Sequence, residues 1–156
     1  MKPLDAMRRI FRTTLVLSLL STPLLAGDLV NVAGASRIAV GGYDPVAFFT
    51  DGKPVPGVPS ISATYQGAIY LFASEEHKRL FTQNTEKYAP QYGGFCAYGV
   101  SRNALAPVDI STWQARDGKL YLNLNQDIVK KFNADFKGNV SKADENWPGL
   151  VMKNGQ

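Results

Sequence analysis

Short apolar segments joined by two-residue turns predict two β-hairpins in this chain. The first hairpin has strands at Ile61–Tyr65 and Ala68–Phe72, separated by two residues. The second has strands at Thr112–Arg116 and Lys119–Asn123. The dipeptide between them, Asp117-Gly118, is the strongest hairpin signal in the chain, because both residues accept the positive φ that a tight turn requires.

A helix is predicted after the first hairpin, beginning at Ser74. The Ser74 hydroxyl can accept a backbone N–H of the first turn, and the helix runs to about Gln83. Leu80 and Phe81 lie on its inward face, and His77 lies three and four residues before them. We therefore expect His77, the only histidine, near the core edge of that face.

Two further helices are predicted in the last third of the chain. Asn125 can cap a helix from residue 126 to about 136, which Gly138 stops. A short helix follows at 141–147, closed by Pro148-Gly149.

The remaining elements are short. We expect a strand at 37–40, a turn at 43–49 that buries aromatic side chains, and a strand at 95–100. Together these elements predict an α+β fold, with a small antiparallel sheet of short strands and hairpins packed against a few short helices.

The first 26 residues have the pattern of an export signal. Basic residues precede the apolar run 15–20, and Pro23 and the small Ala26 follow it. The run is too short to span a membrane. Arg8-Arg9 also resembles the start of a twin-arginine signal, but its flanking residues depart from that pattern and favour ordinary secretion. We expect a periplasmic or secreted protein without stable membrane insertion after signal removal.

The predicted organisation is a signal at 1–26, a flexible lead-in at 27–35, one domain at 36–150 and a tail at 151–156. The whole chain has 17 basic and 13 acidic side chains, and the predicted signal holds four of the basic and one of the acidic ones. The rest has a net charge of +1, which leaves no basic surface for nucleic acid. One cysteine cannot form an internal disulfide.

The most distinctive segment is Tyr88–Val100, which holds a Gly-Gly pair, three tyrosines and the only cysteine, Cys96. Cys96 and His77 are the best soft or imidazole metal ligands of the predicted mature chain. If they meet, with Asp44 nearby, they could bind a copper ion as a mixed sulfur and nitrogen site. They could instead form a thiol enzyme, in which His77 takes the thiol proton. On base rates, however, a lone cysteine between apolar residues is a buried core residue.

Three motifs resemble the YHS-domain family, and more narrowly its small exported bacterial members. They are Gly42-Tyr43-Asp44-Pro45-Val46, Tyr70-Leu71-Phe72-Ala73-Ser74 and Tyr88-Ala89-Pro90-Gln91-Tyr92-Gly93-Gly94-Phe95-Cys96-Ala97. The resemblance covers residues 36–150. It implies a compact α+β domain of a kind often linked with metal handling.

The chain departs from the metal-binding members of that family at three positions. Those members place cysteines after Asp-Pro-Val and in a Phe-Cys-Ser-x-x-Cys segment, where this chain has Ala47, Ala73 and His77. A structural zinc site needs four nitrogen or sulfur ligands, which one copy of this chain lacks.

We therefore expect a non-enzymatic exported domain that binds a metal ion, such as copper, or a small ligand. The candidate metal ligands are His77, Cys96 and Asp44. Part of the aromatic set, Tyr43, Tyr92 and Tyr98, could form a pocket for an apolar or flat ligand. A thiol enzyme and a purely structural interaction module are the alternatives.

Overall fold

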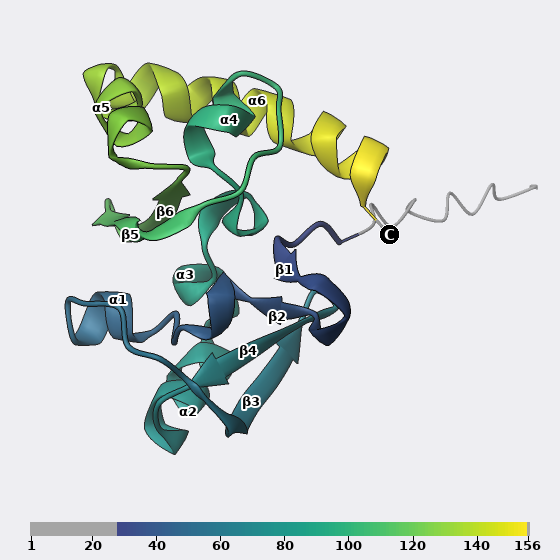
Figure 1. Ribbon diagram of the computed structural model, residues 1–156, viewed down its shortest axis with the longest axis vertical. Helices are drawn as coiled ribbons and strands as arrows, with labels where there is room; N and C mark the ends of the chain where they lie inside the picture. Colours follow the sequence, from purple (N-terminus) through teal and green to yellow (C-terminus); the bar gives the residue numbers. More distant parts are fainter. Residues whose placement is uncertain (1–27, 156) are drawn as a thin grey trace, which may run out of the picture.

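The structure, a computed structural model, describes residues 28–155, so the predicted export signal lies outside the described part. The described helices include none with the length and apolar character needed to cross a membrane. The chain folds into an α+β architecture, as the sequence predicted. The described residues form a four-stranded sheet with three short helices and a two-stranded hairpin with three helices. Figure 1 shows that these two groups of elements form two halves of the molecule.

The larger sheet contains the first predicted hairpin. Its strands are β1 (Val32–Ala33), β2 (Ile38–Ala39), β3 (Val58–Tyr65) and β4 (Ala68–Phe72), in the order β1-β2-β4-β3. The β3–β4 and β1–β2 pairs are antiparallel, whereas β2 pairs with β4 in parallel. The sheet is therefore mixed, and its parallel pair joins segments that lie on either side of α1 in the sequence.

The second hairpin forms a separate two-stranded sheet. It consists of β5 (Asp109–Arg116) and β6 (Lys119–Asn123), with Arg116 opposite Lys119 at the turn. Asp117 and Gly118 both have positive φ, 53° and 73°. This is the turn geometry that the Asp-Gly dipeptide favours.

Helices cover both sheets, and most are short. They are α1 (Ala47–Thr50), α2 (Glu75–Gln83), α3 (Thr85–Tyr88), α4 (Ala97–Ser101), α5 (Gln126–Ala134) and α6 (Phe136–Asn154). The predicted caps of α2 and α5 are present, because the side chains of Ser74 and Asn125 accept backbone N–H groups of the first helical turns.

Strand β6 joins two hydrophobic clusters. Leu120 and Leu122 are buried in the first cluster, with the larger sheet, α1 and α2. Tyr121, which points to the opposite face of the strand, is buried in the second cluster with residues of α4, α5 and α6. One strand thus presents apolar side chains to both halves of the molecule.

The segment expected to form a strand at 95–100 forms helix α4 instead. An apolar run of this length fits a buried helical turn as well as a strand, so its pattern does not discriminate between them. The Cys96 thiol accepts the Gly99 N–H at the start of α4, which favours the helical turn.

The prediction that Gly138 stops one helix and Pro148 another was wrong, because both residues lie inside α6. Gly138 occupies the first turn, where its N–H donates to the Asp135 carboxylate. Pro148 removes one backbone donor, but Ala143 and Leu150 are buried on either side of it and anchor the helix.

Two expected elements need correction, and the predicted lead-in and tail also contain regular structure. The strand expected at 37–40 is limited to β2, because Val40 begins the 3₁₀ turn Val40–Gly42, and the turn expected at 43–49 contains the start of α1. The lead-in 27–35 carries β1 and the 3₁₀ turn Gly34–Ser36. The tail at 151–156 supplies the end of α6.

The hairpin turn yields a direct stability prediction. A Cβ at Gly118 or at Gly149 meets nothing within 4 Å, but only Gly118 has positive φ. We expect Gly118→Ala to lower the free energy of unfolding by about 1 kcal/mol or more, because an L side chain is strained there. In the control, Gly149→Ala in α6 should raise it by roughly 0.5–1 kcal/mol. Urea denaturation measures both changes; equal effects at the two sites would contradict the turn assignment.

Candidate functional site

Asp44 is a fully buried carboxylate that connects three elements of the first half. Its Oδ1 atom accepts hydrogen bonds from the backbone N–H groups of Val46 (2.8 Å) and Ala47 (3.4 Å) at the start of α1. Its Oδ2 atom accepts the Ala73 N–H (2.8 Å) at the end of β4 and lies 2.7 Å from Nδ1 of His77 in α2. A buried carboxylate is stabilised by such a complete set of donors.

These contacts bring together the three positions, Ala47, Ala73 and His77, at which the sequence comparison with the YHS family expected metal-binding cysteines to be replaced. Ala47, Ala73 and His77 all contact the same carboxylate, the alanines through their backbone N–H groups. The carboxylate and the imidazole thus stabilise this junction by hydrogen bonding.

The other ring nitrogen of His77 faces the surface of α1. Nε2 lies 3.3 Å from the Thr50 hydroxyl and 3.7 Å from Oδ1 of Asp51. A hydroxyl, an imidazole and a carboxylate in a row resemble a nucleophilic triad. However, the Thr50 hydroxyl makes its shorter contact, 2.7 Å, with Asp51. Since a hydroxyl has one proton, this geometry favours a structural hydrogen-bond network over an activated nucleophile.

The Asp44 network predicts a large loss of stability on a minimal change. Asp44→Asn replaces one of two carboxylate oxygens, which accept from Val46, Ala73 and His77, by an amide N–H₂ that can only donate. We expect the free energy of unfolding to fall by about 3 kcal/mol. Asp51→Asn is the control, because Asp51 is partly exposed and its contact with His77 is long; it should cost less than about 1 kcal/mol. Similar losses in urea denaturation would show that burial of Asp44 is unimportant.

Cys96 lies in the other half of the molecule from His77, as the N-cap of α4. Its side chain is 2% exposed. The thiol is 3.6 Å from Oδ1 of Asn123, to which it can donate, and accepts the Gly99 N–H at 3.4 Å. Both hydrogen-bonding functions of the thiol therefore have partners inside the protein.

The sequence left open whether Cys96 and His77 meet, and the structure places them apart. The polar contacts of His77 come from the segments around α1 and β4, whereas those of Cys96 come from α4 and β6. Figure 1 shows α2 and α4 in opposite halves of the molecule. Within residues 28–155, no group of three or more His, Cys, Asp or Glu side chains is placed to hold a metal ion. Asp44 pairs with His77 alone among the three candidate ligands.

The burial of Cys96 predicts a slowly reacting thiol. In the native protein we expect labelling by a disulfide reagent such as DTNB only as fast as the chain opens, because the sulfur is buried and hydrogen-bonded. Labelling in guanidinium chloride should be complete within the mixing time and provides the control. Rapid labelling of Cys96 in the native protein would indicate that solvent reaches the thiol and would support the thiol-enzyme alternative.

The three tyrosines expected to share a pocket lie in different places. Tyr43 packs against the first hydrophobic cluster and forms an isolated bridge with Pro56. Tyr98 carries Arg102 over its ring, at 4.8 Å from the centroid, and its hydroxyl accepts from that guanidinium. Of the three, only Tyr92 borders a large cleft.

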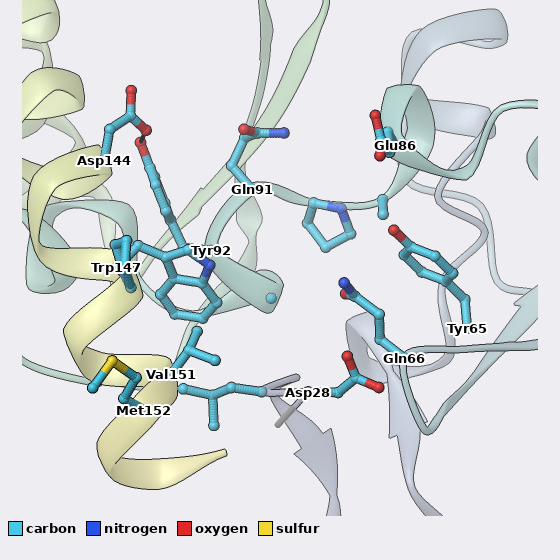
Figure 2. Close-up of a pocket in the computed structure, with 15 residues that line it drawn as sticks. Asp28, Tyr65, Gln66, Glu86, Gln91, Tyr92, Asp144, Trp147, Val151 and Met152 are labelled. Carbon is cyan, nitrogen blue, oxygen red and sulfur yellow. Dashed lines mark hydrogen bonds between the residues drawn. The ribbon is translucent and has the colours of Figure 1, made fainter. Parts of the chain in front are cut away.

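This cleft has a volume of about 500 Å³ and lies where the two halves meet. Figure 2 shows Trp147 and Tyr92 on one side of it and Tyr65, Gln66 and Asp28 on the other. The 15 lining residues come from the N-terminal segment, the β3–β4 turn, the 86–93 segment and α6. They are Asp28, Leu29, Tyr65, Gln66, Glu86, Ala89, Pro90, Gln91, Tyr92, Gly93, Asp144, Trp147, Pro148, Val151 and Met152.

The Gly-Gly motif shapes one wall of the cleft. Tyr92, Gly93 and Gly94 all have positive φ, 54°, 58° and 80°. A Cβ at Gly93 would overlap the backbone of Leu29, and the Gly93 carbonyl accepts the Asn31 N–H at 2.8 Å. The glycine therefore permits the N-terminal segment to lie directly against this wall, and the strained Tyr92 marks the wall as a candidate site.

Tyr92 is held firmly in this wall. Its hydroxyl donates to Oδ1 of Asp144 at 2.9 Å, and its ring centroid lies 6.0 Å from that of Trp147. Burial, followed by the hydrogen bond to Asp144, raises the pKa of Tyr92 well above its ordinary value. The phenol thus stays a neutral donor at physiological pH.

Comparisons with protein-family models, curated proteins and solved structures found no match to this chain. Of the residues that line the cleft, the sequence predicts only Tyr92 as a site residue. Trp147, Asp144, Glu86 and Asp28 carry no such signal. Trp147 lies at the end of the helix predicted at 141–147, which Pro148-Gly149 was expected to close.

Proposed function

We propose that this chain is an exported, non-enzymatic YHS-like domain that binds a small organic ligand in the cleft beside Tyr92. The observation that carries the proposal is the cleft itself, a hollow of about 500 Å³ between two hydrophobic clusters with aromatic side chains in its walls. Small-molecule sites are typically concave, of this size, and lined by aromatic residues with a few polar groups.

The aromatic residues of the cleft are held by the fold before any ligand arrives. Tyr92 is fixed by Asp144 and by the packing of its ring, and Trp147 is packed against the second cluster. Tyr65, on the opposite wall, packs against Phe81 of α2 at 6.1 Å between ring centroids. A preformed wall lowers the entropy lost on binding, which supports recognition of a small molecule.

The copper and thiol-enzyme alternatives have less support. A copper pair needs His77 and Cys96 together, and a thiol enzyme needs an imidazole beside the thiol. The described neighbour of the Cys96 sulfur is the amide of Asn123, which cannot act as a base at neutral pH.

The proposal predicts binding that depends on Trp147. In the test, a Trp113→Phe variant leaves Trp147 as the only fluorescent indole. A panel of phenethylamine, phenethyl alcohol, phenylacetate and hexamethylenediamine is titrated, and indole NMR shifts locate the contact. We expect at least one compound to bind saturably. Trp147→Leu, measured by calorimetry because it lacks the reporter indole, should weaken binding at least tenfold, because the indole forms a cleft wall.

Trp113→Phe alone should leave the affinity unchanged, since Trp113 packs in the first cluster and does not border the cleft. If no compound binds, or if binding survives in Trp147→Leu, the cleft proposal fails. Saturable copper binding that is lost in both Cys96→Ser and His77→Ala would support the metal function in its place.

A further inference from the structure

We infer that the ligand of this cleft is an aliphatic di- or polyamine, in which ammonium groups are separated by methylene segments. This inference rests on the proposed function and names the ligand class of the same site. It is argued from the charge, the arrangement and the apolar surface of the lining residues.

The cleft has a strong excess of negative charge. Among its lining residues, Asp28, Glu86 and Asp144 are acidic, and no lysine, arginine or histidine borders it. The excess is local, because basic and acidic side chains are nearly balanced over the chain that follows the predicted signal. Charge complementarity therefore selects a cation and disfavours an anion.

The carboxylates are distributed around the cleft. Asp28 precedes β1, Glu86 belongs to α3 and Asp144 belongs to α6. Figure 2 shows Asp144 on the Trp147 side, with Glu86 and Asp28 on the opposite side. Within the described residues, Glu86 and Asp28 have no hydrogen-bonded or ion-paired side-chain partner, whereas Asp144 accepts the Tyr92 hydroxyl. Separated carboxylates match a ligand with separated positive charges better than a single ammonium.

The surface between these carboxylates is apolar and aromatic. Trp147 and Val151 of α6 face the cleft in Figure 2, and Met152 also borders it; these residues offer contact to methylene groups. The indole and phenol rings also attract an ammonium through cation–π interactions. The side-chain amides of Gln66 and Gln91 supply neutral acceptors.

The test compares probes that differ only in charge. Hexamethylenediamine carries two positive charges, hexanediol is neutral and adipate carries two negative charges, and all three have six carbon atoms. Spermidine is added as a longer polyamine. With Trp147 fluorescence as the signal, we expect the diamine to bind at least tenfold more tightly than the diol, and adipate not to bind. Added salt should weaken diamine binding and leave diol binding unchanged, because exposed charges are screened.

Variants that each remove one negative charge identify the carboxylates that attract the diamine. Glu86→Gln and Asp28→Asn should each weaken diamine and spermidine binding about threefold, as expected for exposed ion pairs, without changing diol binding. Glu145→Gln is the matched control, because Glu145 neighbours Asp144 on α6 but does not border the cleft. It should leave every affinity unchanged.

The outcomes separate this inference from the proposed function. Equal binding of diamine and diol, or binding only of a neutral or anionic compound from the phenethyl panel, would overturn the polyamine inference and leave the cleft function standing. Diamine binding that Glu145→Gln weakens as much as Glu86→Gln does would also overturn it, since the attraction would then be general. Absence of binding by every probe would overturn both.

Discussion

The burial of β6 on both faces is the constraint on which the rest of the structure depends. Leu120 and Leu122 belong to one hydrophobic cluster and Tyr121 to the other. A strand buried on two sides cannot slip by one residue, because a slip would exchange all three side chains between clusters. The register that Asp117-Gly118 sets at the turn therefore also determines which side chains of β6 enter each cluster.

The cleft follows from the same constraint. Pro90 forms a bridge to Leu120, and the Tyr92 ring lies 6.3 Å from that of Tyr121, so the 90–92 segment crosses from one cluster to the other beside β6. Crossing within so few residues requires a sharp reversal, which the left-handed residues from Tyr92 to Gly94 provide. The space beside that reversal is the cleft, and α6 closes it from the second half.

Sequence patterns predicted the locally encoded parts of this fold. Two-residue turns and side-chain caps depend on a few neighbouring residues, and both hairpins and the caps of α2 and α5 were predicted correctly. The predictions were wrong where contacts between residues far apart in the sequence determine the secondary structure. Gly138 and Pro148 remain helical because residues of α6 on either side of them are anchored in the second cluster, which no local pattern reveals.

The same distinction between local patterns and distant contacts applies to the candidate site. The Tyr-Gly-Gly motif can be recognised in the sequence, and Asp44, His77 and Cys96 can be recognised as candidate metal ligands. Their partners are not visible, since Asp44 meets His77 across 33 residues and Tyr92 meets Asp144 across 52. Contacts of that separation depend on how the elements pack, which one sequence without an alignment does not specify.

The chain thus uses its single histidine and single cysteine to stabilise local structure. His77 completes the hydrogen bonds of a buried carboxylate, and Cys96 caps a helix with a buried thiol. Both groups would suit metal chemistry, but each already has its partners within the protein. Groups that are free to meet a ligand are found instead at the cleft, where carboxylates border an aromatic wall. The recognition of a cation that we propose for the cleft is electrostatic and aromatic, and it involves neither His77 nor Cys96.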